Sequence, residues 1–178
     1  YWMVPLSLRI GREGMALNRV RQGLVMTPAL LDSLELAVRQ APDNPRTAFQ
    51  LGDALRRFSL QGEASWQDYG QRAVASLSRA VKLNPHDARA QLALGQTYHW
   101  LNQPEAAAAA FTEALRLGPN DVDIHNNVAW YLLQQGRIAE ARQMAQQTLV
   151  WQWWSNPLAM EILQQADQRL KSAGAPQP

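Results

Sequence analysis

The side chains that most often carry out chemistry in proteins are few in this sequence and widely spaced. The three histidines are His86, His99 and His125, and no two stand four residues apart on one helix, as two ligands of one metal ion often do. Cysteine is absent, which excludes disulfides and thiolate chemistry. The sequence has no glycine-rich phosphate loop, no H-E-x-x-H and no G-x-S-x-G. We therefore predict no catalytic residue, no metal site and no cofactor, and expect that the chain is not an enzyme.

The composition is that of an ordinary folded domain. The chain has 178 residues, of which 47% are hydrophobic and 18% are charged, and its net charge is +2. So small a positive excess argues against nucleic acid as the partner. No run of 18 apolar residues occurs, so no segment is expected to span a membrane by itself.

An internal repeat dominates the second half of the sequence. Gly95 aligns with Ala129, and Ala107 aligns with Ala141, with 34 residues between the members of each pair. A fixed period of this size is the signature of stacked helix pairs. Asn102 and Gly136 occupy equivalent turn positions, where a left-handed backbone conformation is expected.

Residues 88–121 carry a recognisable pattern. Its seven positions, spaced L-G-x2-Y-x8-A-x3-F-x2-A-x4-P, are Leu94, Gly95, Tyr98, Ala107, Phe111, Ala114 and Pro119. This pattern resembles the tetratricopeptide repeat (TPR) family, which has the same period. The resemblance implies an all-α fold: a right-handed superhelical solenoid of antiparallel helix pairs, about nine helices in all, with a C-terminal capping helix.

The repeat boundaries divide the chain into six segments. They are an apolar N-terminal segment (1–12), a degenerate first helix pair (13–44), a repeat with a nine-residue insertion (45–87), a repeat of regular length (88–121), a repeat with an extended second helix (122–157), and a capping helix and tail (158–178). Three segments are typical helix starts: Thr27-Pro28, Ser65 to Asp68, and Asn156-Pro157. Pro119 ends a helix, and Asn120 or Asp121 caps the next one.

The insertion lies within residues 56–70. One interpretation is an extended helix and turn with no further role. The other is a partner contact that uses Phe58 or Trp66, because insertions in repeat arrays often project from one face.

The resemblance also implies where a partner binds. Repeats of this family bind peptides or helices in a concave groove lined by the first helix of each pair. The positions that face the groove are Arg46, Phe49, Gln50, Asp53, Arg56, Arg57, Arg89, Leu92, Ala93, Gln96, His99, Trp100, Asp123, Asn126, Asn127, Trp130, Leu133 and Gln134.

Among these positions we select eight as partner-binding residues. They are Asn127, Asn126, Trp130, Arg89, Gln96, His99, Arg56 and Phe49. An amide both donates and accepts hydrogen bonds, which suits the backbone of a bound peptide. Arginines such as Arg56 and Arg89 grip carboxylates with paired donors. In the alternative, the asparagines and arginines are solvated polar residues of exposed helix faces.

The segment WQWW at 151–154 is the most unusual local feature. In an extended helix, Trp151 and Trp154 share one face, and Trp153 points elsewhere. These two residues either pack against the capping helix or form a second contact, with a partner protein, a membrane interface or another copy of the chain.

Three functions remain open. The first is a protein–protein interaction scaffold that binds a protein or peptide segment in the groove. The second is an accessory TPR domain of a bacterial membrane-bound glycan polymerase or ligase. The irregular first helix pair and the long insertion of this chain resemble the TPR tails of O-antigen ligase-type proteins. The third is a free-standing assembly factor of an envelope complex.

The start of the sequence bears on this choice. Its apolar YWMVPL run, followed by Arg9 and Arg12, is typical of a membrane exit with flanking charge. Because the first residue is Tyr1, we expect a piece of a longer or processed chain, with any membrane spans upstream. A bacterial membrane-associated or extracytoplasmic location and a cytoplasmic one both fit the sequence. The apolar N-terminus also permits an oligomer.

Overall fold

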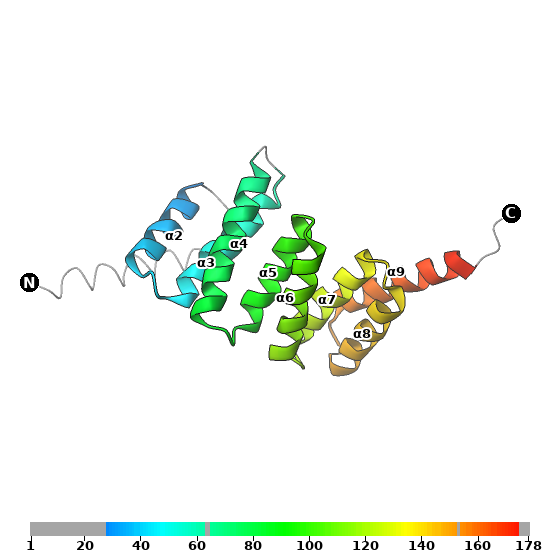
Figure 1. Ribbon diagram of the computed structural model, residues 1–178. Coiled ribbons are helices and arrows are strands. Elements are labelled where there is room, and N and C mark those ends of the chain that lie inside the picture. The colour runs from blue at the N-terminus through cyan, green and yellow to red at the C-terminus, as the bar shows by residue number, and fades with distance from the viewer. Residues whose placement is uncertain (1–27, 63–64, 153, 175–178) are drawn as a thin grey trace, which may run out of the picture. The chain divides into compact units, whose positions relative to one another are not determined.

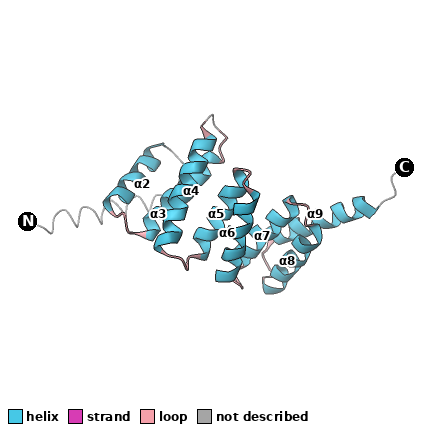
Figure 2. Ribbon diagram, viewed as in Figure 1, coloured by secondary structure: helices cyan, strands magenta, loops and turns pink. Residues whose placement is uncertain are grey.

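The computed structural model describes residues 28–62, 65–152 and 154–174, and all regular structure in these ranges is helical (Figures 1 and 2). The eight described helices are α2 (Pro28–Gln40), α3 (Pro45–Ser59), α4 (Trp66–Leu83), α5 (Ala88–Trp100), α6 (Pro104–Leu117), α7 (Val122–Gln134), α8 (Ile138–Trp151) and α9 (Pro157–Gly174). The all-α, TPR-like fold class is therefore confirmed. The partner helix expected at 13–22 lies outside the described residues.

The chain divides into two compact units, Tyr1–Ala110 and Phe111–Pro178. In the first unit, α3 packs against α4, α2 packs on α3, and α4 packs on α5. Leu34, Leu55 and Leu77, one from each of the first three helices, are fully buried in this core. Periodic apolar residues on each helix thus bury one face per helix, as expected for stacked helix pairs.

Gly52 lets α3 and α4 approach closely. A β-carbon at this position would lie 2.6 Å from the Leu77 Cγ atom and 3.0 Å from the Leu77 backbone nitrogen. Any side chain here therefore requires the backbone of α4 to move. Leu51 and Gly52 correspond to Leu94 and Gly95 of the repeat motif, so this close approach explains a small residue at the second position of the motif.

Short polar side chains set where the helices begin. The Asn44 side chain accepts from the backbone N–H of Arg46, and the Asp87 side chain accepts from two N–H groups of α5. The Asp121 side chain caps α7 in the same way, as predicted. Ser65 does precede α4, but its side chain makes no capping hydrogen bond.

The two inter-helix turns have the predicted backbone. Asn102 has φ of 57° and Gly136 has φ of 75°. Both residue types tolerate this left-handed conformation better than others do. The equivalence of the two repeats thus extends to their turns.

In the described part of the insertion, residues 56–62 and 65–70, α3 continues to Ser59 and α4 begins at Trp66. Phe58 lies in the last turn of α3, is buried, and makes an edge contact with Tyr69 of α4 at a ring separation of 4.7 Å. Since the Phe58 side chain fills the core of the first unit, it is not available as the partner contact considered above.

In the second unit, α8 packs on both α7 and α9. Ile124, Leu133 and Ile162 are its largest fully buried apolar side chains. The helix α9 covers the preceding pair, which confirms the predicted capping helix. Its first residue is Pro157, as expected.

The prediction of an extended second helix in 122–157 is wrong. The helix α8 has 14 residues, the same length as α6, and ends at Trp151. Gln152 leaves the helical region, with φ of −140° and ψ of 77°, and its side-chain amide donates to the Ser155 carbonyl. The four residues beyond the repeat period therefore belong to the connection to α9 and add no helical turn.

Candidate functional site

The first unit presents a surface made by α3 and α5, which contact each other. We call it the first-helix face and define it by exposed or half-buried side chains of the two helices, of which Phe49 also packs against the core. They are Arg46, Phe49 and Arg57 on α3, and Arg89, Leu92, Gln96 and Trp100 on α5. Four of them (Arg46, Arg57, Arg89 and Trp100) are exposed, and the others are half-buried.

Trp100 is held in place although it is 38% exposed. Its indole nitrogen donates to the Ser59 hydroxyl oxygen at 2.9 Å, and that hydroxyl donates to the Trp66 carbonyl oxygen at 2.6 Å. The Trp66 ring meets the Trp100 ring edge-on at 5.3 Å. Trp66 therefore acts within the fold, as a support for Trp100. No sequence pattern signals this arrangement, because Ser59 and Trp100 belong to different repeats.

The arginines of α3 are not equivalent. Asp53 is buried and pairs with both neighbours: its Oδ1 atom is 2.7 Å from Arg56 Nη2, and its Oδ2 atom is 2.9 Å from Arg57 Nε. The Arg56 side chain is 16% exposed and lies against this carboxylate, whereas the Arg57 side chain is 49% exposed. The structure thus places Arg56 inside an ion-pair cluster, and Arg57 at the surface.

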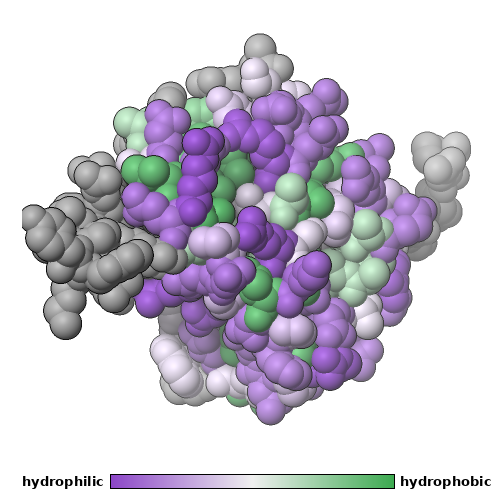
Figure 3. All heavy atoms as spheres, turned by 60° about the vertical axis from the view of Figure 1, so that its left-hand side comes forward, coloured by the Kyte–Doolittle hydropathy of each residue, from purple (hydrophilic) through white to green (hydrophobic). Residues whose placement is uncertain are grey.

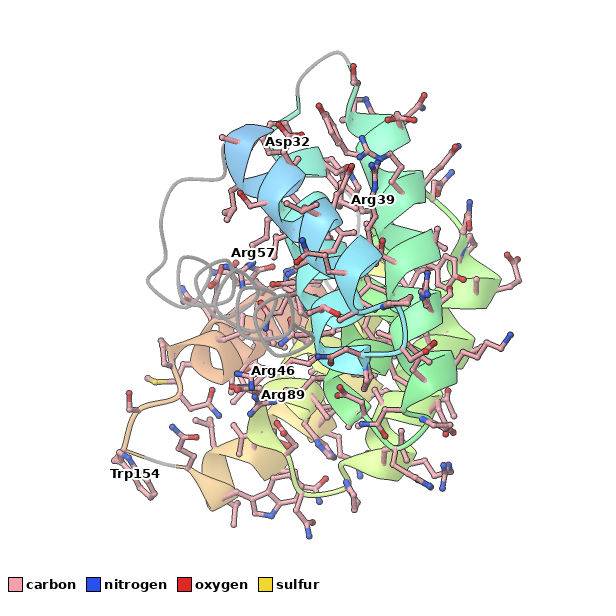
Figure 4. All side chains as sticks on the ribbon, turned by 90° about the vertical axis from the view of Figure 1, so that its left-hand side faces the viewer. Asp32, Arg39, Arg46, Arg57, Arg89 and Trp154 are labelled. Atoms are coloured by element: carbon pink, nitrogen blue, oxygen red, sulfur yellow. The ribbon has the colours of Figure 1, made fainter. Side chains whose placement is uncertain are left out.

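Arg46 and Arg89 give the first-helix face its charge. Each is the second residue of its helix and is exposed, and Figure 4 shows both at the same end of α3 and α5. Within the described part of the chain neither has an ion-pair partner. This end of the face therefore presents two exposed guanidinium groups, next to the Asp87 carboxylate that caps α5.

His99 contributes little to that charge. It is half-buried at the end of α5, and burial lowers the pKa of its imidazole from the usual value of 6.5 because the charged form loses solvation. The neutral ring is therefore the dominant form at neutral pH. Gln96, one turn earlier, is half-buried on the same helix face.

In the second unit, Asn126 lies in the interior, 5% exposed. Its amide nitrogen donates to Asn156 Oδ1 at 2.8 Å, and its amide oxygen accepts from the Thr148 hydroxyl at 2.8 Å. Asn156 Oδ1 also accepts from the Ala159 backbone N–H at the start of α9. Because its amide is used to join α7, α8 and α9, Asn126 is placed as a structural residue and not at a binding surface.

Asn127 and Trp130 lie on the surface of α7. The Asn127 amide nitrogen donates to the Asp123 carbonyl oxygen at 2.7 Å, and Trp130 is exposed. The two residues are three apart on one helix, which places them on the same face. They form a surface of the second unit that combines an amide with an indole.

The described residues of the WQWW segment lie partly in α8 and partly in the connection to α9. Trp151 ends α8 and packs edge-on against His125 at 4.9 Å, and His125 itself is buried, as expected. Trp154 follows in the connection to α9, is 68% exposed, and points outward in Figure 4. Trp151 and Trp154 therefore do not share a helix face, and Trp153 lies outside the described residues.

Two further properties of the described residues concern metal binding and membrane crossing. Among the described residues, no group of three or more histidine or acidic side chains is placed to hold a metal ion. None of the described helices is long and apolar enough to cross a membrane.

The family model of the tetratricopeptide repeat matches residues 70–99 and 101–157. This supports the family resemblance drawn from the sequence motif. The match begins within α4 and ends at the first residue of α9. No curated protein matches the chain.

Solved structures show the same fold. A thermophilic TPR protein of Thermus thermophilus, TTC0263, is 23% identical, with a TM-score of 0.75 over 86% of this chain and 79% of that one. MamA is 18% identical, with a TM-score of 0.61 over 94% of this chain and 81% of that one. At these identities the likeness shows the fold alone.

A subunit complex of the APC/C, Cut9–Hcn1, is similar over part of its length. It is 18% identical, with a TM-score of 0.73, and the match covers 89% of this chain but only 30% of that one. None of these three structures is a glycan polymerase or ligase, so the comparisons do not support a relationship to O-antigen ligase tails.

Proposed function

We propose that this chain is a protein–protein interaction scaffold that binds a segment of another protein on the first-helix face. The tetratricopeptide repeats support the general role, because stacked helical repeats present extended binding surfaces and are typically scaffolds. The side chains of α3 and α5 support the choice of the first-helix face as the binding surface.

The observation that carries the proposal is the fixed, exposed indole of Trp100. A tryptophan is among the residues that contribute most to binding energy at interfaces. Its ring is already oriented by Ser59 and Trp66, so little side-chain freedom is lost when a partner covers it. A solvent-exposed ring held in this way is suited to serve as an anchor for a partner.

The remaining side chains of the face define what the partner must offer. Phe49 and Leu92 supply half-buried apolar surface, and Gln96 supplies an amide. Arg46 and Arg89 supply positive charge at one end. A complementary segment therefore carries an apolar side chain and at least one carboxylate, which arginine binds with paired donors.

We propose a smaller set of partner-binding residues, chosen by the burial and contacts of their side chains. We retain Arg89, Gln96 and Phe49, and we add Arg46 and Trp100. Arg56 is occupied by Asp53, and neutral His99 adds no charge.

In the second unit we propose that Asn127 and Trp130 bind partner residues. Asn126 is left out because its amide is buried in the network with Asn156 and Thr148.

Site-specific photo-crosslinking tests the proposal. A photo-reactive amino acid in place of Gln96 should capture a partner in source cells, and the same group in place of Glu105 should not. Glu105 is an exposed residue of α6 in the same unit, so it controls for incidental collisions. Equal capture at both positions, or capture at Glu105 alone, would contradict the proposal.

The alternative is an accessory domain of a membrane-bound glycan polymerase or ligase. The tetratricopeptide repeat match supports the scaffold role more directly than this alternative. We therefore carry forward the scaffold alone.

A further inference from the structure

A cavity of about 290 Å³ opens to solvent between α2 and α4, away from α5 and from the exposed side chains of the first-helix face. It is lined by Glu35, Val38, Arg39, Leu51, Leu55, Arg72, Ala75 and Ser76. These residues come from α2, α3 and α4, all within the first unit. No part of the proposed function above uses this cavity.

The floor of the cavity is apolar. Leu51 and Leu55 of α3 form it, and both side chains are otherwise buried in the core. Val38 and Ala75 form the adjoining walls. In Figure 3, apolar atoms lie in hollows between polar side chains on this side of the molecule. An apolar side chain placed on this floor would leave water and contact leucine methyl groups, which is favourable.

The cavity exists because α2 and α4 both pack on α3 and are joined to each other by polar side chains. Arg72 of α4 forms an ion pair with Glu35 of α2. Arg79 of α4 donates to the Pro42 carbonyl oxygen at 2.7 Å, just beyond α2. These long side chains span the distance between the two helices and frame the opening of the cavity. The leucines at its floor are almost covered, with Leu51 7% exposed and Leu55 1% exposed.

Among the residues that line the cavity, two arginines accompany one carboxylate. Arg72 lies close against Glu35 and is 3.7 Å from Asp68, and Arg39 is a second partner of Glu35, at 3.9 Å. The Arg39 side chain is 79% exposed and lies on the side of α2 that faces α4 in Figure 4. Because this ion pair is long and the side chain is exposed, the Arg39 guanidinium can also bind a carboxylate of a partner.

We propose that this cavity is a second protein-binding site, for a segment that inserts one aliphatic side chain onto Leu51 and Leu55 and places a carboxylate against Arg39. The volume lies at the lower end for small-molecule pockets, which also enclose most of their ligand. A cavity of this size that is open to solvent suits a single protruding side chain of a protein. The charge of Arg39 selects an acidic neighbour for that side chain.

Selection from a random peptide library displayed on phage tests the site with the full chain as target. Selected peptides are then measured against three variants. Ala75→Trp fills the cavity from its exposed wall, Arg39→Glu reverses the charge at the opening, and Lys82→Glu reverses an exposed charge elsewhere on α4. We expect peptides that pair an aliphatic residue with Asp or Glu, and that bind the first two variants at least tenfold more weakly. Lys82→Glu should bind them as the wild type does.

Two outcomes overturn the proposal. In one, every selected peptide binds Ala75→Trp and Arg39→Glu as tightly as the wild type. In the other, the peptides lose affinity for Arg89→Glu instead, which assigns them to the first-helix face. Because the two faces respond to different variants, failure here leaves the proposed function untouched.

A second measurement covers the case in which a variant fails to fold. Methyl NMR signals of Val38, Leu51 and Leu55 in the wild-type chain should shift when a selected peptide is added. Unchanged signals at a saturating peptide concentration would rule out the cavity as its site.

Discussion

The indole nitrogen of Trp100 donates a hydrogen bond of 2.9 Å to the hydroxyl oxygen of Ser59, which lies 41 residues earlier in the chain. The contact joins the end of α5 to the last residue of α3. Through it, the long repeat with the insertion and the regular repeat that follows share one aromatic cluster. The most exposed aromatic ring of the first-helix face therefore depends on a buried serine.

Replacement of Ser59 by alanine tests that dependence. The buried hydroxyl both accepts from Trp100 and donates to the Trp66 carbonyl. Its removal takes away the acceptor of the Trp100 indole N–H and the second donor to the Trp66 carbonyl, so we expect a loss of ~1–3 kcal/mol in the free energy of unfolding. Denaturant unfolding followed by circular dichroism measures it. Ser78→Ala, at an exposed position of α4, should change stability by less than about 0.5 kcal/mol. Equal effects of the two substitutions would refute the structural role of Ser59.

Gly52→Ala tests the close approach of α3 and α4. Alanine is favoured over glycine within a helix by ~0.5–1 kcal/mol, so propensity alone predicts a more stable protein. The new methyl group would instead lie 2.6 Å from Leu77 Cγ and 3.0 Å from the Leu77 backbone nitrogen. We expect overpacking to dominate, with a net loss of about 1–3 kcal/mol in unfolding free energy. A higher melting temperature for Gly52→Ala would show that this contact is not as the structure describes.

The neighbours Asn126 and Asn127 provide a matched pair. Asn126→Ala removes a buried amide and its two hydrogen bonds, to Asn156 and Thr148, which should cost about 2–3 kcal/mol of stability. Asn127→Ala changes the surface and should cost about 0.5 kcal/mol or less. Thermal unfolding of the two variants checks the difference. Similar melting temperatures would mean that Asn126 does not hold α7, α8 and α9 together.

His99 predicts a direction for the dependence of stability on pH. Burial lowers its pKa in the folded chain below the value of 6.5 expected when unfolded. Between these two pKa values the unfolded chain binds the proton more strongly, so acid favours unfolding. The contribution of His99 to stability is therefore complete above about pH 6.5 and decreases as the pH falls below it. Unfolding free energies measured from pH 7 downward should fall less steeply for His99→Gln. An unchanged slope would contradict the burial of this ring.

Local features of the fold follow from the sequence, because they depend on residues close together in the chain. Asp121 caps α7, Asn102 and Gly136 take left-handed turns, and α9 begins at Pro157. Each of these depends on the backbone preference of one residue, or on a hydrogen bond from that residue to a neighbour in the sequence. The 34-residue period then predicts where corresponding helices of successive repeats lie in the sequence.

The end of α8 shows where local reasoning fails. Because a proline commonly follows the end of a helix, the late position of Pro157 indicates an extra turn on the preceding helix. Pro157 does begin α9, as predicted, but α8 ends at Trp151. The residues between them form a connection in which Asn156 caps α9 and meets Asn126. A proline can follow the end of one helix or begin the next. Here the connection before it is fixed by the contact of Asn156 with Asn126 of α7, which the local sequence does not reveal.

The binding surface was only partly predictable for the same reason. Asn126 and Asn127 are adjacent, yet one residue of helical rotation places the first in the interior and the second at the surface. A groove position carried over from a repeat family does not distinguish them. The support of Trp100 by Ser59 and Trp66 was not predictable either, since it joins two repeats of unequal length.

The central claim is that a partner binds the first-helix face, and affinity measurements on the partner captured at Gln96 test it most directly. Isothermal titration should show at least tenfold weaker binding to Arg89→Glu than to the wild type, because the reversed charge repels the carboxylate of the partner. Lys82→Glu, an equal change of charge on α4, should bind as the wild type does. Equal affinity for the wild type and both variants, or an equal loss in both, would contradict the claim that this face makes the contact.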